Sequence, residues 1–256
     1  MSSETEAKPR AAYVAAYTAI GAAIYYMLLF LPGVPIIGTT GKMEIAAALS
    51  PVLGVLLGPV PGFGAVLIGN ILKFLTTPNI RSLPFIPAAP LSALAAGFLT
   101  EKKWRIPAVI MIAILVAAMF APPFSPLTEN WYVYLVAFYD KIAALILIPV
   151  AMWLLHRKSS RYYYAALYML MFISREFDKA FGCTVFAFPQ VYQEVFGITK
   201  VSTVRKLYLV SPLYYLAEYI LEGLVAFIVA LALIEAVSRV PGLAENLHVR
   251  HLYRRE

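Results

Sequence analysis

The sequence predicts an all-α integral membrane protein, because its composition and its long apolar runs both exceed what a soluble fold needs. Hydrophobic residues fill 61% of the 256 positions and charged residues 14%, whereas a soluble domain carries about 25% charged residues. The mean hydropathy of +0.77 leaves little polar surface for water. Ala11 to Leu31 holds 21 residues without a charge, enough to cross a hydrocarbon core about 30 Å thick. A soluble domain and a secreted enzyme are excluded.

Apolar runs separated by Pro, Gly and charged residues predict a polytopic bundle in one membrane domain. The second to fifth runs are short and contain Pro and Gly, so we expect six to eight transmembrane helices. Residues 1–10 are expected to be a cytoplasmic segment, 11–237 the bundle, and 238–256 a basic cytoplasmic tail. The eight predicted helices are Ala11–Leu31, Met43–Pro59, Phe63–Thr76, Phe85–Thr100, Ile106–Ala121, Trp131–Leu155, Tyr162–Phe188 and Leu207–Val237.

The distribution of basic residues predicts the orientation, since Lys and Arg concentrate in cytoplasmic loops. With the N-terminus inside, the inner segments hold twelve Lys and Arg and the outer segments hold five. This bias favours eight crossings with both termini cytoplasmic, in the plasma membrane. The net charge of +7 is therefore expected to meet anionic lipid headgroups, and a nucleic-acid partner is not predicted.

Motifs for catalysis or metal binding are missing from the sequence. Cys183 is the single cysteine, so an intrachain disulfide is excluded, and no Cys/His spacing resembles a zinc site. There is no H-E-x-x-H or G-x-S-x-G pattern, and the run from Gly38 to Lys42 lacks the Walker A spacing. We therefore predict no enzyme, no catalytic residue, no metal and no cofactor in this chain. Glu218 and Glu222, as paired carboxylates, leave a membrane-embedded acid–base enzyme as an alternative.

Ten ionisable residues fall at predicted membrane depth, where each costs about 2.5–3.5 kcal/mol on insertion scales. All ten lie in the predicted outer half, which predicts a polar cavity that is open to the outside or occluded from it. The alternative is mutual pairing of Arg175 with Asp178 or Glu222, and of Lys73 with Glu44. The ten residues are Glu44, Lys73, Asp140, Lys141, Arg175, Glu176, Asp178, Lys179, Glu218 and Glu222.

Helical spacing selects the candidate substrate-binding residues from this region, because residues three and four apart share a helix face. Lys73 and Arg175 are candidates for binding an anionic group, and Glu218 with Glu222 for binding donors or a cation. The complete candidate set is Asn70, Lys73, Asp140, Arg175, Asp178, Tyr215, Glu218 and Glu222.

A stripe of alanines follows one face of the first predicted helix. Small residues let membrane helices approach closely, and such packing drives association in lipid. The stripe is expected either to pack within the chain or to dock another membrane subunit. Its members are Ala12, Ala15, Ala16, Ala19 and Ala23.

Four segments resemble the substrate-binding S-components of energy-coupling-factor vitamin transporters. They are the alanine-rich first helix, the loop LPGVPIIGTTGKME, the pair ALSPVLGVLLGPVPGFGAVLIGNILKFL, and the helix PAAPLSALAAGFLTEKK with its basic inner turn. The resemblance implies a compact bundle that captures a vitamin or similar micronutrient at its outer end. It also implies docking, through the alanine face, on a transmembrane coupling subunit driven by two ATPases, which would use the ATP. Six helices are usual in that family, and this chain has two further predicted spans.

Two other classes are open alternatives. Intramembrane acids also suit a stand-alone carrier coupled to protons or sodium, although the sequence has no inverted repeat of the kind that many carriers show. A structural or assembly subunit would tolerate replacement of the charged residues. An S-component binds its ligand alone but needs ATPase partners for transport, whereas a carrier transports alone with an ion gradient.

Overall fold

The computed structural model describes residues 7–35, 42–157, 160–240 and 247–248, and it is almost entirely helical. A short antiparallel ribbon pairs Gly33 with Glu44. The elements in chain order are α1 (Ala7–Leu28), β1 (Gly33–Pro35), β2 (Lys42–Glu44), the 3₁₀ helix η1 (Ile45–Leu49), α2 (Ser50–Leu57), α3 (Pro59–Thr76), η2 (Leu83–Phe85), α4 (Ala88–Thr100), α5 (Arg105–Met119), α6 (Leu127–His156), α7 (Ser160–Phe186), α8 (Pro189–Tyr192) and α9 (Val201–Ser238).

Each of the eight predicted helices has a counterpart, and the differences lie at the ends. The predicted start at Met43 is wrong, because β2 holds that residue and the helical backbone begins at Ile45. The last helix starts at Val201 instead of Leu207. The short helix α8 was not predicted, and it begins at Pro189, a residue whose fixed φ suits the first helical position.

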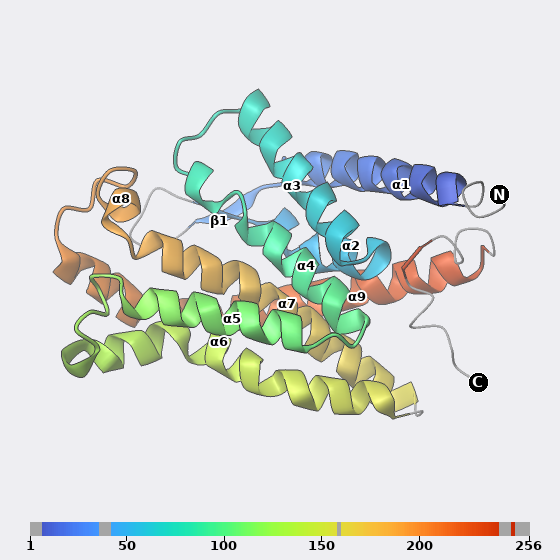
Figure 1. Cartoon of the computed structure of the whole chain (residues 1–256). Coiled ribbons are helices and arrows are strands. Elements are labelled where there is room, and N and C mark those ends of the chain that lie inside the picture. Colours follow the sequence, from blue (N-terminus) through green and yellow to red (C-terminus); the bar gives the residue numbers. More distant parts are fainter. Residues whose placement is uncertain (1–6, 36–41, 158–159, 241–246, 249–256) are drawn as a thin grey trace.

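The long helices lie side by side with the start of α1 and the end of α9 at one end of the bundle (Figure 1). The ribbon and α8 lie toward the opposite end (Figure 1). Helix α7 is central and contacts α4, α5, α6 and α9, whereas α1 packs mainly on α3 at the edge. From Ala166 to the end of α7 no residue is exposed, and one side of α1 is left open.

Glycines bring α2, α3 and α4 into backbone contact. A Cβ added at Gly54 would lie 2.0 Å from the carbonyl oxygen of Ala93, and one at Gly97 would lie 2.4 Å from Pro59 Cα. Between α2 and α3 the chain turns at Gly58, whose φ of +92° is a conformation that L side chains rarely adopt. These contacts explain how short, Pro- and Gly-containing helices pack tightly.

Five helices of the described residues are long and apolar enough to cross a membrane: Ala11–Leu28, Pro59–Thr76, Leu83–Thr100, Leu127–His156 and Glu218–Ser238. The helices also expose large apolar side chains, including Met27 at 71%, Val109 at 66% and Ile146 at 66%. Water would not favour such a surface, but lipid does. The chain thus has the make-up of a helical membrane protein.

Candidate functional site

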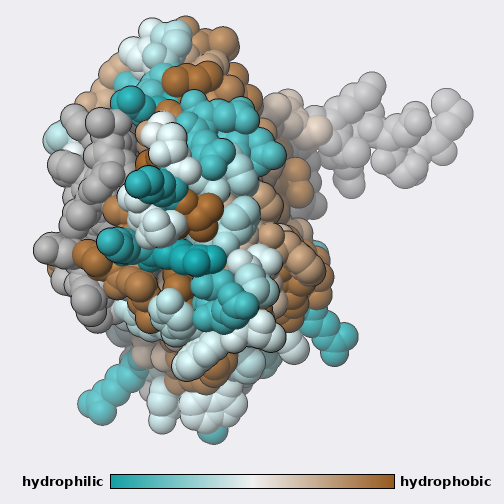
Figure 2. All heavy atoms as spheres, turned by 90° about the vertical axis from the view of Figure 1, so that its left-hand side faces the viewer, coloured by the Kyte–Doolittle hydropathy of each residue, from teal (hydrophilic) through white to brown (hydrophobic). Residues whose placement is uncertain are grey.

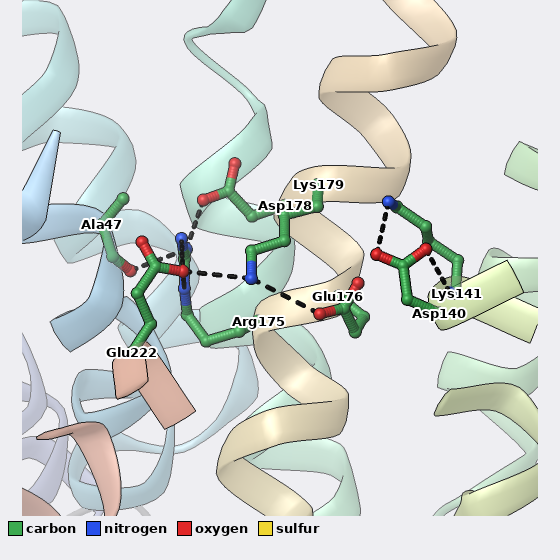
Figure 3. Close-up of polar contacts among 8 residues, drawn as sticks. All are labelled: Ala47, Asp140, Lys141, Arg175, Glu176, Asp178, Lys179 and Glu222. Carbon is green, nitrogen blue, oxygen red and sulfur yellow. Dashed lines mark hydrogen bonds and ion pairs between the residues drawn. The ribbon is translucent and has the colours of Figure 1, made fainter. Parts of the chain in front are cut away.

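Charged side chains gather inside the bundle where α6, α7 and α9 meet, close to the carbonyl of Ala47 in η1 (Figure 3). We call this set the charged cluster. Five of its seven members are less than a tenth exposed, and the remaining two, Asp178 and Glu222, have side chains exposed by 16% and 13%. The members are Asp140, Lys141, Arg175, Glu176, Asp178, Lys179 and Glu222.

Arg175 connects three parts of the fold. Its Nη1 donates to the carbonyl oxygen of Ala47 at 2.8 Å and also to Asp178, one turn along α7. Its Nη2 lies 3.0 Å from Glu222 Oε2 on α9. The planar guanidinium, with five donors in a fixed fork, suits this task in a way that a lysine ammonium does not. Arg175 therefore ties α7 to both η1 and α9.

Lys179 lies one turn further along α7 and shares an acceptor with Arg175. Its Nζ is 3.1 Å from Glu222 Oε2 and 3.4 Å from Glu176 Oε1. The same ammonium lies 3.3 Å from the centre of the Tyr219 ring, a cation–π distance. Glu222 thus accepts from two cations on the neighbouring helix.

Helix α6 contributes a buried pair of its own. Lys141 Nζ lies 2.7 Å from Asp140 Oδ2, and the Lys141 backbone N–H donates to Asp140 Oδ1 at 3.0 Å. Lys141 Nζ is 5.4 Å from the Tyr219 ring centre. Tyr219 of α9 therefore lies between the cations of α6 and α7.

The structure brings together four of the eight candidate residues in the charged cluster, namely Asp140, Arg175, Asp178 and Glu222. Glu218 lies one turn before Glu222 on α9, is half-buried, and forms no ion pair with any described residue. Tyr215 also lies on α9, but its side chain falls outside the described part of the chain.

The remaining two candidates make other contacts. Asn70 donates to the carbonyl oxygen of Ile86 at 2.9 Å, and Lys73 Nζ lies 3.4 Å from the centre of the Phe30 ring. The structure thus gives Lys73 an aromatic partner, and the side chain of Glu44, its predicted partner, lies outside the described residues. Arg175, in contrast, pairs with both Asp178 and Glu222, as the pairing alternative predicted.

Sequence reasoning left four participants out of the candidate set. Lys141, Glu176 and Lys179 are among the ten ionisable residues at predicted membrane depth but not among the candidates, although Lys179 shares the α7 face of Arg175. Tyr219 gave no signal, since a tyrosine in an apolar helix is common. A stricter rule would have found the three charged ones: every ionisable residue at membrane depth needs a named partner.

Ion pairs join Arg175 and Lys179 of α7 to Glu222 of α9 within the charged cluster. A hollow of about 280 Å³ does lie between α6, α7 and α9, but its walls carry no charge. It is lined by Leu147, Ala165, Tyr168, Met169, Phe172 and Ile220. None of these lining residues belongs to the charged cluster, so this hollow lacks the polar lining that the sequence predicts.

The end of the bundle next to α8 shows hydrophilic residues gathered across the middle of the face, with hydrophobic residues beside them (Figure 2). This end is the predicted outer one. Among the described residues, no group of three His, Cys, Asp or Glu side chains is placed to hold a metal ion. The contacts that the structure shows in the charged cluster are ion pairs and hydrogen bonds.

The chain is similar to an uncharacterized protein of Methanocaldococcus jannaschii, with 27% identity over 221 residues. The aligned part covers 82% of this chain and 68% of the relative. No family model matches the chain, and no solved structure matches it.

Proposed function

We propose that this protein is the substrate-capture subunit of an energy-coupling-factor importer. In this role it would bind a vitamin or similar micronutrient in the outer half of an eight-helix bundle. Both termini would be cytoplasmic in the plasma membrane, and the chain would dock on a transmembrane coupling subunit driven by two ATPases. The observation that carries the proposal is the open alanine face of α1, and the charged cluster supports it as the place where a polar solute would enter.

Helix α1 presents its small residues outward. All five alanines of the stripe are exposed, while Gly21 and Tyr25 on the opposite side are buried against the bundle. Packing within the chain thus uses the other face of the helix. A flat exposed face of small residues is what a close helix–helix contact with another membrane subunit requires.

Replacing Ala19 with Trp should abolish co-purification of the coupling subunit and leave the chain folded, because the indole would hold the facing helix away. The matched control is Ile24→Trp, which adds bulk at an exposed position on α1 about a third of a turn from the centre of the stripe. The measurement is the amount of partner retained by tagged protein from its own cells. Equal retention in both variants would argue against docking through this face.

Glu218 offers the ligand a free carboxylate at the edge of the charged cluster. It is half-buried and has no ion-pair partner among the described residues, so its charge is available to a cationic or hydrogen-bond-donating group. We expect Glu218→Gln to weaken ligand binding about tenfold or more, as loss of a charged hydrogen bond does, with little change in thermal stability. Isothermal titration with the ligand identified below measures this.

Native mass spectrometry of gently purified protein tests the proposal as a whole. A retained micronutrient, together with a membrane partner and ATPases, would support it and would name the substrate. A chain that carries neither ligand nor partner would contradict it.

A stand-alone ion-coupled carrier is the second candidate, and the buried excess of acidic over basic residues in the charged cluster favours it. Four acids face three bases there. A carrier would move its solute in liposomes that contain this chain alone when an ion gradient is imposed, whereas a capture subunit would not. Flux in such liposomes would replace the first proposal with the second.

A further inference from the structure

Glu176 is the acid of the charged cluster that its neighbours satisfy least. Its side chain is completely buried, and only Oε1 has a partner, Lys179 Nζ at 3.4 Å. Oε2 has no hydrogen-bond partner among the described residues. Figure 3 shows this second oxygen pointing away from Lys179. A carboxylate charge left in this position would be unpaired on one side.

The other three acids are held as carboxylates by short contacts to cations. Asp140 accepts from Lys141 at 2.7 Å, Glu222 accepts from Arg175 at 3.0 Å, and Asp178 accepts from Arg175. The 3.4 Å contact of Glu176 is the longest ion pair in the cluster. Because the cluster holds four acids and three bases, one proton makes it electrically neutral, and neutrality is what burial favours.

We propose that Glu176 is a proton-binding site, and that the ion-paired cluster seen here is its protonated form. A neutral carboxylic acid leaves one unpaired polar oxygen, which costs far less than an unpaired buried charge. Among the described residues, no group of three His, Cys, Asp or Glu side chains surrounds Oε2 to hold a metal ion, so the site suits a proton better than a metal. This inference goes beyond the proposed function, since substrate capture does not require a proton.

The groups that face Glu176 come from three helices, and they determine how loss of its proton would change the ion pairs. The nearest base, Lys179, is shared with Glu222, so deprotonation of Glu176 would make two acids compete for one ammonium. That competition would weaken the α7–α9 connection at Lys179. The helices α2 and α4, also packed on α7, contain no ionisable residue within their bounds. The facing groups are Tyr139, Asp140 and Lys141 of α6, Arg175, Lys179 and Cys183 of α7, and Tyr219 and Glu222 of α9.

Infrared spectroscopy of the purified full-length protein at neutral pH tests the assignment directly. The wild type should show the carbonyl stretch of a protonated carboxylic acid, shifted in D₂O, and Glu176→Gln should remove it. The variant Glu218→Gln, which removes the neighbouring half-buried acid, should retain the band. A wild type without the band, or a band lost in Glu218→Gln and kept in Glu176→Gln, would overturn the proposal.

Thermal stability gives a second test, because a protonated Glu176 and a charged, ion-paired Glu176 predict different melting temperatures. Glutamine copies the shape and neutrality of protonated glutamate, so Glu176→Gln should keep the melting temperature at neutral pH within about 2 °C of wild type, whereas Asp140→Asn should lower it by about 6 °C or more. As the pH rises, wild type loses its bound proton and should lose stability relative to Glu176→Gln.

Two results would overturn the proposal. A melting temperature at neutral pH that is much lower in Glu176→Gln than in wild type would show that Glu176 is a paired carboxylate. A melting temperature that rises with sodium but not with potassium, in wild type only, would show a sodium site.

Discussion

Replacing Arg175 with alanine should destabilise the protein by about 3–5 kcal/mol, the range for removing one partner of a buried ion pair. The change would leave Asp178 and Glu222 without their guanidinium and the Ala47 carbonyl without its donor. Three parts of the fold lose their connection at one point, namely η1, α7 and α9. We expect a fall of roughly 6–20 °C in the melting temperature in detergent, measured by tryptophan fluorescence or by aggregation of the purified protein.

Arg239→Ala is the matched control, because it removes an arginine that also pairs with a glutamate, Glu235, but on the surface. The side chains of that pair are 74% and 62% exposed, and such pairs contribute about 0–1 kcal/mol. Arg175→Lys should restore part of the stability, since lysine retains the charge but not the fork of donors. If Arg175→Ala melted at the same temperature as Arg239→Ala, the charged cluster would not hold the helices together.

Gly54→Ala should destabilise the bundle by about 3 kcal/mol or more, at or beyond the upper end of the range for overpacking a core. The added methyl carbon would lie 2.0 Å from the carbonyl oxygen of Ala93 and 2.9 Å from its Cα. Both obstacles are backbone atoms, which cannot rotate away as a side chain can, so α2 and α4 must move apart. The expected result is a poor yield of monodisperse protein and a strongly lowered melting temperature.

Gly64→Ala provides a control with the opposite expected sign. Gly64 lies in α3, and an added Cβ would meet only Thr18 Cγ2, at 3.8 Å. In open space within a helix, alanine is more favourable than glycine by about 0.5–1 kcal/mol. We therefore expect Gly64→Ala to be neutral or slightly stabilising. Equal stability of the two variants would contradict the close approach of α2 and α4.

Arg175 is both a candidate ligand residue and a member of the ion-paired charged cluster. From the sequence, Arg175→Ala or Glu222→Ala is expected to remove ligand binding while the protein still inserts. The structure adds that Arg175 stabilises the fold through its ion pairs, so a loss of binding in that variant has two explanations. Glu218 is the better probe, because it has no ion pair to lose within the described residues.

Hydrophobicity alone determined the class of this protein and the existence of its helices. Apolar runs of sufficient length have no stable place in water, and the backbone in lipid must satisfy its own hydrogen bonds, so helices follow from composition. The same reasoning placed Arg175, Asp178 and Glu222 at one depth, because charges that interrupt apolar runs are visible in the sequence. Helix ends were less predictable: the ribbon at Met43 depends on pairing with a strand several residues away.

Only the tertiary structure decided which charges meet and which surfaces stay open. Lys73 and Arg175 look equivalent in the sequence, yet Lys73 lies on the Phe30 ring and Arg175 joins three elements. Likewise, an alanine stripe is compatible with packing inside or outside, and the open face of α1 follows from its place at the edge of the bundle. How the helices pack also leaves Glu176 Oε2 without a hydrogen-bond partner among the described residues. Composition fixes what must be buried, whereas partners across helices depend on how the helices are packed.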